Sequence, residues 1–205
     1  MTVRNLSPSD YDAIIRVVDD WWGGRPMASM LPRVLVEHFA DTSFAAEVNG
    51  VLAGFLVGFC SQSRLSEAYV HFVGVHPDKR GGGLGRLLYE TFFEVAEARG
   101  CTVVRAITAP VNIRSVAFHR RMRFDIEPGR WEQGGIPFTA DYDGPGQDRV
   151  RFIKHLDSAL SLRPATMAAA QVRDGGRGGQ PGRSRLRADP CLVLARACRT
   201  GRTPA

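Results

Sequence analysis

The stretch Arg80-Gly81-Gly82-Gly83-Leu84-Gly85 decides the fold of this 205-residue chain. It follows an apolar run over residues 68–75 that has the pattern of a buried strand. After it, apolar and small residues recur with helical spacing, at Leu84, Leu87, Leu88, Thr91, Phe92 and Val95. The pattern predicts a glycine-rich turn that leads from a strand into the N-terminus of an amphipathic helix. Its free N–H groups, the helix dipole and the charges of Arg80 and Arg86 favour a phosphate or diphosphate ligand.

The common nucleotide motifs do not fit this turn. A G-x-G-x-x-G motif would need glycine where Arg86 or Leu88 stands, and the acidic residue expected about 20 positions later is replaced by the stretch around Arg105. A P-loop needs Gly-Lys-Ser/Thr, which is absent from the sequence. A turn that only connects strand and helix is the simplest alternative. The spacing that does fit is Arg-x-x-Gly-x-Gly, formed by Arg80, Gly83 and Gly85.

With this spacing the chain resembles the GCN5-related N-acetyltransferases. The resemblance extends to Val73-Gly74-Val75-His76-Pro77 before the turn and to a second motif from Asn112 to Phe124, and it covers about residues 2–156. It implies an α/β fold with a mixed, mostly antiparallel sheet of about seven strands flanked by helices. It also implies an enzyme that transfers an acetyl group from acetyl-CoA, as cosubstrate and without a metal, to a primary amine.

The hydrophobic pattern along the chain agrees with this fold. Asn49-Gly50 is a strong hairpin signal between two strands, and Ser7-Pro8 and Gly100 are typical of a helix start and a helix end. Residues 128–148 are rich in glycine and proline and are expected to form a long loop or hairpin. The predicted strands cover residues 2–6, 43–48, 51–59, 67–75, 102–108, 124–126 and 149–156. The predicted helices begin at residues 8, 31, 84 and 112.

The charge distribution divides the chain into two parts. Residues 1–156 contain 18 basic and 18 acidic side chains, so the net charge of +6 lies in residues 157–205, with nine arginines and three aspartates. We expect one acetyltransferase domain over residues 1–156 and an Arg/Gly-rich, disordered tail. The balanced domain gives no electrostatic support for nucleic-acid binding. Binding of nucleic acid through the tail is a less favoured alternative.

Composition also bears on location and on cysteine chemistry. The sequence has no apolar stretch of about 18 residues and no apolar signal-peptide core near its N-terminus, so we expect a cytoplasmic protein without a membrane partner. Scattered cysteines at positions 60, 101, 191 and 198 predict neither a metal site nor a disulfide framework. The sequence is compatible with either a monomer or a homodimer.

The resemblance assigns cofactor contacts to the strand, the turn and the second motif. The pantetheine arm would lie along the strand that ends at Val75, and the N–H of Val73 or Val75 would point at the thioester oxygen. Asn112 would contact the same arm. The predicted cofactor-binding residues are Val73, Val75, Arg80, Gly81, Gly82, Gly83, Leu84, Gly85, Arg86, Asn112 and Ser115.

The base that deprotonates the amine should lie on the same strand. Strand alternation predicts Glu67, Tyr69, His71 and Val73 on one face. Related enzymes often use a glutamate at the position of Tyr69, and tyrosine is no base near neutral pH. Glu67 and His71 therefore remain as the two candidates, with Glu67 slightly favoured.

The second motif suggests an acid for the leaving thiolate. On a helix, Asn112, Ser115 and His119 share one polar stripe. The family has a tyrosine general acid at the place of His119. A histidine with its ordinary pKa near 6.5 could protonate a thiolate as an imidazolium, or could hold a water instead.

The acceptor pocket of this fold would be built from residues 21–27 and about 131–148. The first segment supplies aromatic walls and the second supplies Asp141, Tyr142 and Asp143, a lining that suits a cationic amine, either a small molecule or a peptide. No cysteine is placed as a nucleophile, so we expect direct attack in a ternary complex. A noncatalytic acyl-CoA sensor is the main alternative.

Overall fold

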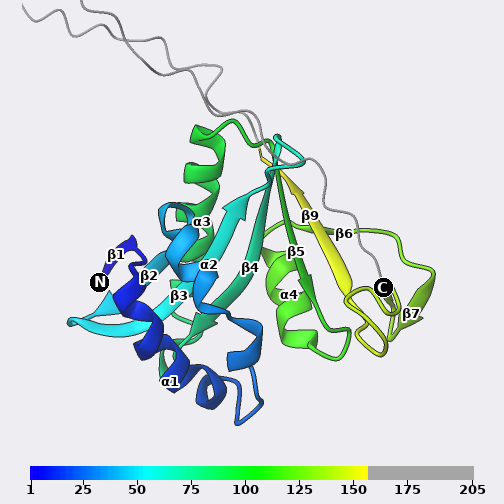
Figure 1. Ribbon diagram of the computed structural model, residues 1–205. Helices are drawn as coiled ribbons and strands as arrows, with labels where there is room; N and C mark the ends of the chain where they lie inside the picture. Colours follow the sequence, from blue (N-terminus) through cyan, green and yellow to red (C-terminus); the bar gives the residue numbers. More distant parts are fainter. Residues whose placement is uncertain (157–205) are drawn as a thin grey trace, which may run out of the picture. The chain divides into compact units, whose positions relative to one another are not determined.

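A seven-stranded sheet organises residues 1–156, the part of the chain that the computed structural model describes (Figure 1). The strand order is β1-β2-β3-β4-β5-β9-β6; β4 and β5 are parallel and all other neighbours are antiparallel. A separate hairpin pairs β7 with β8. The strands are β1 (Thr2–Asn5), β2 (Phe44–Val48), β3 (Val51–Cys60), β4 (Glu67–Val75), β5 (Val103–Thr108), β6 (Asp125–Ile126), β7 (Trp131–Gln133), β8 (Ile136–Phe138) and β9 (Val150–His155).

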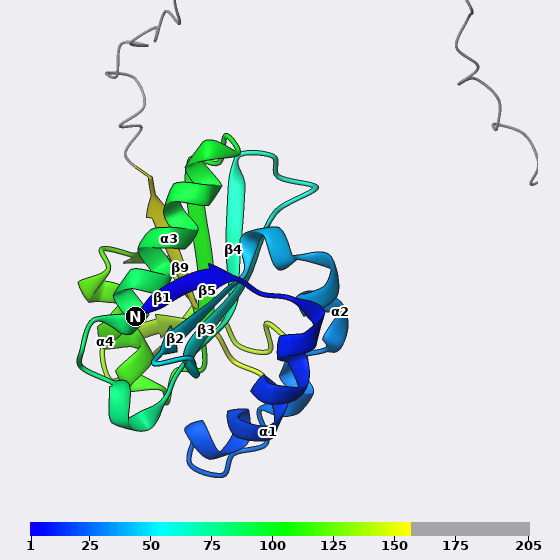
Figure 2. The same cartoon turned by 90° about the vertical axis from the view of Figure 1, so that its left-hand side faces the viewer.

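Helices cover the sheet from both sides, as Figure 2 shows. On one side, α3 and α4 enclose a core that includes Leu88 and Phe92. On the other side, α1 and α2 enclose a second core around Phe55. The helices are α1 (Tyr11–Trp21), α2 (Arg33–His38), α3 (Leu84–Ala98) and α4 (Ile113–Arg121), with short 3-10 turns η1 (Pro8–Asp10), η2 (Ala28–Met30), η3 (Ala40–Thr42) and η4 (Pro77–Lys79).

The predicted fold class is confirmed, with small differences in the elements. The first helix begins with the 3-10 turn η1, where the backbone N–H of Ser7 donates to the Asp10 carboxylate at 2.7 Å in a capping box. The second helix is shorter than expected and begins after Pro32. The predicted tail, residues 157–205, lies outside the described residues. Within residues 1–156, no helix is long and apolar enough to cross a membrane.

A β-bulge in β4 changes which side chains share a face. Val57 of β3 pairs with Phe72 and Gly58 pairs with Val70, so His71 is an extra residue in β4. Val70 consequently packs against the α3 core while Phe72 packs into the α1 core, and Val73 returns to the α3 side. The simple alternation expected for residues 67–73 is therefore wrong beyond His71.

The two central strands separate after a short parallel ladder. β4 pairs with β5 only from Glu67 to Val70, and both strands continue with partners on their outer sides alone. In Figure 1, β4 and β5 lie close together at their upper ends and diverge towards their lower ends. The N–H of His76 donates to Ala53 on β3, so alternation turns the main-chain groups of Val73 and Val75 towards the open side. The bond from Arg80 Nε to the Val75 carbonyl, at 3.1 Å, agrees with this orientation.

Candidate active site

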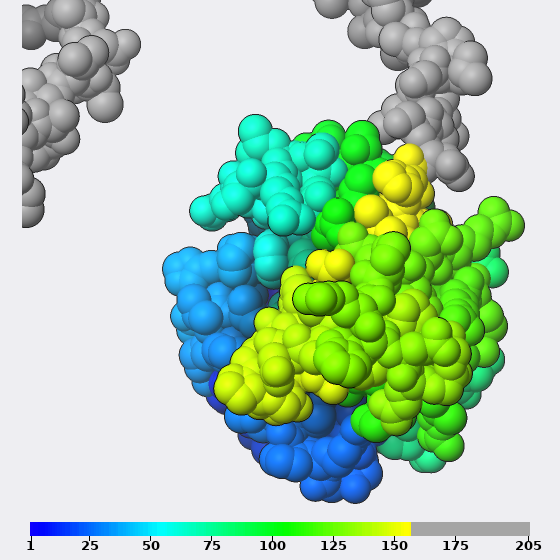
Figure 3. All heavy atoms as spheres, turned by 90° about the vertical axis from the view of Figure 1, so that its right-hand side faces the viewer, coloured from blue at the N-terminus to red at the C-terminus, as the bar shows by residue number. Residues whose placement is uncertain are grey.

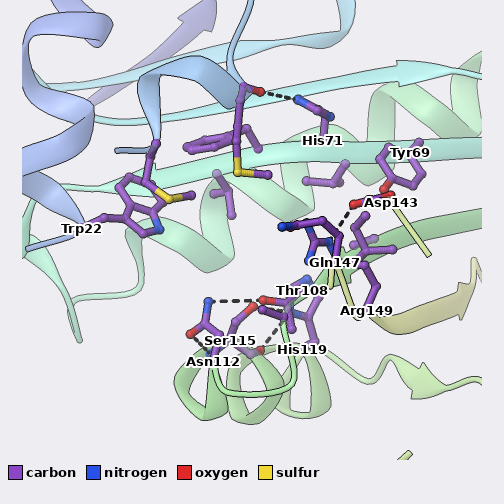
Figure 4. Close-up of a pocket in the computed structure, with 18 of the residues that line it drawn as sticks. Trp22, Tyr69, His71, Thr108, Asn112, Ser115, His119, Asp143, Gln147 and Arg149 are labelled. Atoms are coloured by element: carbon purple, nitrogen blue, oxygen red, sulfur yellow. Dashed lines mark hydrogen bonds and ion pairs between the residues drawn. The ribbon is translucent and has the colours of Figure 1, made fainter. Parts of the chain in front are cut away.

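A cavity of about 520 Å³ lies where β4 and β5 diverge. Its lining comes from the segment after α1, from β4 and β5, from α4 and from the loop that precedes β9. Figure 3 shows the corresponding hollow between the blue N-terminal atoms and the yellow atoms before β9. Figure 4 shows His71 on one side of the cavity, Ser115 and His119 opposite it on α4, and Trp22 at one end.

His71 lines this cavity at the bulge of β4. Its Nε2 lies 2.8 Å from the carbonyl oxygen of Met30. A carbonyl oxygen only accepts, so Nε2 carries the hydrogen and the neutral ring keeps its lone pair on Nδ1. The bulge and the Met30 bond together orient a proton-accepting nitrogen within a partly buried site.

Glu67 lies at the other end of β4 and does not line the cavity. Its carboxylate is 2.7 Å from Arg105 Nε and 3.3 Å from Arg64, within a cross-strand network that continues to Glu127. Burial raises the pKa of Glu67, but the hydrogen bonds and charges of Arg105 and Arg64 outweigh it and leave the pKa below its ordinary value. Its position therefore does not support the prediction of Glu67 as the base.

His119 is buried beneath the cavity, with 3% of its surface exposed. Its Nδ1 lies 2.9 Å from the Ser115 carbonyl, and its ring stacks on Phe152 at 4.2 Å between centroids. Because that carbonyl only accepts, Nδ1 carries the hydrogen and Nε2 accepts from the Tyr89 hydroxyl at 2.9 Å.

Burial lowers the pKa of His119 to about 4, although the hydrogen bond to Ser115 opposes this shift. The ring is therefore neutral near pH 7. An imidazolium with an ordinary pKa, as the sequence suggested, does not match this environment, because a charged ring would lose hydration without gaining a counterion.

The start of α4 brings Asn112 and Ser115 to the cavity wall. Asn112 Oδ1 accepts from the Ser115 backbone N–H at 3.3 Å as the N-cap of α4, and its amide donates to Thr108 Oγ1 at 3.2 Å. Of the predicted cofactor contacts, Val73, Asn112 and Ser115 line the same cavity as His71.

The glycine-rich turn has the backbone that its sequence requires. Gly81 and Gly83 adopt φ of +80° and +84°, a region that favours glycine, and a Cβ at either position would meet nothing within 4 Å. Leu84, Gly85 and Arg86 form the first turn of α3, so their N–H groups have no partner within the helix. The turn thus has open space beside Gly81 and Gly83 and free N–H donors at the start of α3.

The two arginines of the turn already form hydrogen bonds or an ion pair within the protein. Arg80 donates to the main-chain carbonyls of Trp21 and Val75, which ties the turn to the ends of α1 and β4. Arg86 pairs with Glu90 at 2.7 Å on the surface of α3. Arg80 therefore fixes the shape of the turn as well as adding charge.

The loop before β9 is held by Arg149, which is 8% exposed. Its guanidinium donates to Asp143 at 2.6 Å, to Gln147 at 2.9 Å and to the Asp148 carbonyl at 2.8 Å. Asp141 accepts from the Gly146 N–H at 2.6 Å within the loop. The acidic lining expected from sequence is consequently neutralised, because Asp143 already has a cationic partner.

Sequence reasoning missed several residues that build the site. Tyr89 comes from α3, thirty positions before His119, and the Met30 carbonyl and Arg149 come from distant loops. No local pattern marks Tyr89 or Met30 as partners of the two histidines. Arg149 after an acidic loop was the one available signal, since a buried arginine needs a carboxylate.

Comparisons with known proteins identify the family. The acetyltransferase (GNAT) family model matches residues 11–124, more than half of the chain. The L-methionine sulfoximine/L-methionine sulfone acetyltransferase of Pseudomonas aeruginosa is 27% identical over 150 residues, covering 67% of this chain and 87% of that protein. An uncharacterized N-acetyltransferase of Methanocaldococcus jannaschii, MJ1207, is 26% identical over 136 residues, 60% of each chain.

Solved structures share the fold at low sequence identity. Diaminobutyrate acetyltransferase EctA from Paenibacillus lautus, in complex with L-2,4-diaminobutyric acid and coenzyme A, has a TM-score of 0.55 at 16% identity and covers 75% of this chain and 93% of its own. The ribosomal-protein-alanine N-acetyltransferase of Brucella melitensis has a TM-score of 0.57 at 21% identity, with 76% and 100% covered. The turn, the divergent strands and these matches agree, and the chain belongs to the acetyltransferase (GNAT) family as an acetyl-CoA-dependent N-acetyltransferase.

Proposed function

We propose that the enzyme transfers the acetyl group directly to a primary amine while both substrates are bound. The observation that carries this proposal is the meeting of His71, Val73 and Ser115 in one cavity beside the open edge of β4. The cavity has room for an acceptor, and among residues 1–156 its lining contains no cysteine that could carry an acyl group. Thioester and amine would therefore react with each other.

The residues present fit acetyl-CoA. The open turn at Gly81 to Gly83 and the free N–H groups of the first α3 turn suit a diphosphate. The unpaired edge of β4 at Val73 and Val75 suits an extended arm with amide groups, which would add to the sheet like a further strand. Asn112 and Ser115 would contact this arm from α4.

His71 would accept the proton that the amine loses. Its lone pair lies on Nδ1 because Nε2–H is bonded to Met30, so attack and proton transfer can occur without a change of tautomer. The N–H of Val73 would donate to the thioester oxygen as it gains negative charge.

The thiolate would leave without help from His119, which is neutral and bonded on both nitrogens. A thiol has a pKa near 8.5, well below that of an alkyl amine, so the sulfur is the better leaving group. Ser115 Oγ accepts weakly from the His119 ring at 3.3 Å, and its own O–H would donate a hydrogen bond that stabilises the departing thiolate.

The test is an assay of the purified protein with acetyl-CoA and a broad panel of amines. Free coenzyme A and acetylated amine should appear together, and initial rates at varied concentrations of both substrates should give intersecting lines. Incubation with acetyl-CoA alone should leave the mass of the protein unchanged. Parallel lines, or an acetylated protein that then passes its acetyl group to the amine, would instead show a covalent intermediate. Coenzyme binding without any turnover would point to the sensor alternative.

A further inference from the structure

Arg25 brings an uncompensated positive charge to the acceptor side of the cavity. Arg25 is an exposed residue at the lining of the cavity, and its one side-chain hydrogen bond runs from Nε to the Trp22 carbonyl at 3.4 Å. Among residues 1–156, Arg25 forms no ion pair. Both terminal nitrogens therefore remain available for a ligand, in the geometry that suits a carboxylate.

The carboxylate of Asp19 contacts the segment that carries Arg25 without pairing with the Arg25 side chain. Asp19 on α1 accepts from the backbone N–H groups of Met27 at 2.7 Å and Ala28 at 2.9 Å. Both bonds are accepted by Asp19 Oδ1, and they pin the chain that carries Arg25 against the end of α1. The backbone that follows Arg25 is thus fixed, while the exposed Arg25 side chain has no acidic partner.

The remaining charges of the lining do not balance Arg25. The cavity is lined by two arginines, Arg25 and Arg149, and by one carboxylate, Asp143. Asp143 is bound to Arg149 at 2.6 Å, and His71 is needed in its neutral form. One positive charge is left for the acceptor to neutralise. A polycationic amine would meet repulsion here, contrary to the expectation that the acidic loop residues raised.

The rest of the acceptor side is apolar. The Trp22 and Phe72 rings lie 5.0 Å apart between centroids, and Met27 and Met30 complete the wall around them. Such a wall favours burial of a hydrocarbon or thioether group. A ligand that matches all three features of this side of the cavity carries an amine for His71, a carboxylate for Arg25 and an apolar group for the wall.

We propose, on the basis of the acetyl-transfer function above, that the acceptor is a free amino acid with an apolar side chain, whose carboxylate is bound by Arg25. The carboxylate contact would be made equally in the ground state and in the transition state. Arg25 therefore acts on acceptor binding, and its loss should raise KM more than it lowers kcat.

The test compares acceptors that differ only in the carboxylate: L-phenylalanine with phenethylamine, and L-leucine with isoamylamine. We expect each amino acid to have a kcat/KM about 10- to 100-fold above that of its decarboxylated partner, the range for a hydrogen-bonded charge pair. Arg25→Ala should remove this advantage and Arg25→Glu should reverse it. Arg16→Ala, which changes an exposed arginine of the preceding helix α1, is the matched control and should retain it.

Coenzyme A affinity measured by calorimetry should be the same for the native protein and for both Arg25 variants, which shows that they are folded. Equal or faster turnover of the amines that lack a carboxylate would overturn this inference and leave acetyl transfer intact. An unchanged amino-acid preference in Arg25→Ala would also overturn it. Turnover of other amines of the broad panel, but of none of these four compounds, would overturn this inference alone. Lack of turnover with the whole panel would overturn the acetyl-transfer proposal, and this inference with it.

Discussion

The ring of His71 on β4 donates its Nε2–H to the carbonyl oxygen of Met30 in η2, across 2.8 Å. This bond joins the strand that would hold the thioester to the segment that walls the acceptor side of the cavity. The tautomer of the proposed base is thereby set by the acceptor side of the site, and Nδ1 is left as the proton acceptor.

Replacing His71 should impair the chemistry, whereas replacing Glu67 should not. His71→Ala is expected to lower kcat by about 10²- to 10⁴-fold, the usual contribution of a general base, and to remove the acidic limb of the pH profile of kcat/KM. Glu67→Gln is the matched control on the same strand. It should lower stability modestly by breaking the pair with Arg105 and leave the profile unchanged. The assignment of the base fails if the acidic limb persists in His71→Ala.

Alanine at neighbouring glycines of the turn should have unequal effects. Gly81 and Gly83 have positive φ, so alanine at either costs about 1–2 kcal/mol of backbone strain and should weaken coenzyme A binding about tenfold by distorting the N–H groups. Gly82 has no positive φ, and its added Cβ would lie 3.7 Å from the Lys79 carbonyl, an ordinary contact. Calorimetry should therefore show near-native affinity for Gly82→Ala, and equal losses at all three positions would argue against the proposed diphosphate site.

The stability of the protein should fall as the pH decreases from about 6.5 to about 4. Burial lowers the pKa of His119 from 6.5 to about 4, so within this window the unfolded chain binds a proton that the native protein does not. The loss amounts to about 3 kcal/mol in the free energy of unfolding. His119→Phe should flatten this dependence in urea titrations at several pH values.

Tyr89→Phe serves as the control for that measurement, because it removes the hydroxyl bonded to Nε2 and keeps the histidine buried. It should lower stability at every pH and preserve the slope between pH 4 and 6.5. A slope that survives in His119→Phe would show that other groups cause the pH dependence.

Arg123→Gly should stabilise the protein by about 1 kcal/mol. Arg123 adopts φ of +60° after α4, where the Phe124 N–H bonds to the His119 carbonyl at 3.0 Å in a Schellman motif. Glycine relieves this strain, although it also gains freedom in the unfolded chain. Ala117→Gly, in the exposed interior of the same helix, should instead destabilise by about 1 kcal/mol. Thermal unfolding of both variants tests the sign of each change.

The sequence predicted the elements that short-range patterns determine. The Asn49-Gly50 hairpin, the strand–turn–helix around Gly83 and the start of a helix at Asn112 each depend on a few consecutive residues. The bulge at His71 was not predictable in this way. Burial alternates through β4 as it would in a regular strand, and the extra residue shows only in the pairing with β3.

The parts of the site that were missed depend on contacts between distant residues. By residue type alone Glu67 is a candidate base, but Arg105 on the neighbouring strand forms an ion pair with it. Asp143 is likewise a candidate amine contact by residue type, but it forms an ion pair with Arg149. His119 has a buried tyrosine as its partner, so its protonation is set by packing. Residue type indicates what a group could do, while its neighbours decide whether it is free to act.

A crystal structure of the protein with coenzyme A tests the account most directly. The diphosphate should accept hydrogen bonds from the N–H groups of residues 81–86, and the pantetheine arm should pair with the edge of β4 at Val73, ending beside His71. A coenzyme bound away from this turn, or an arm that does not enter the space between β4 and β5, would contradict the proposed site.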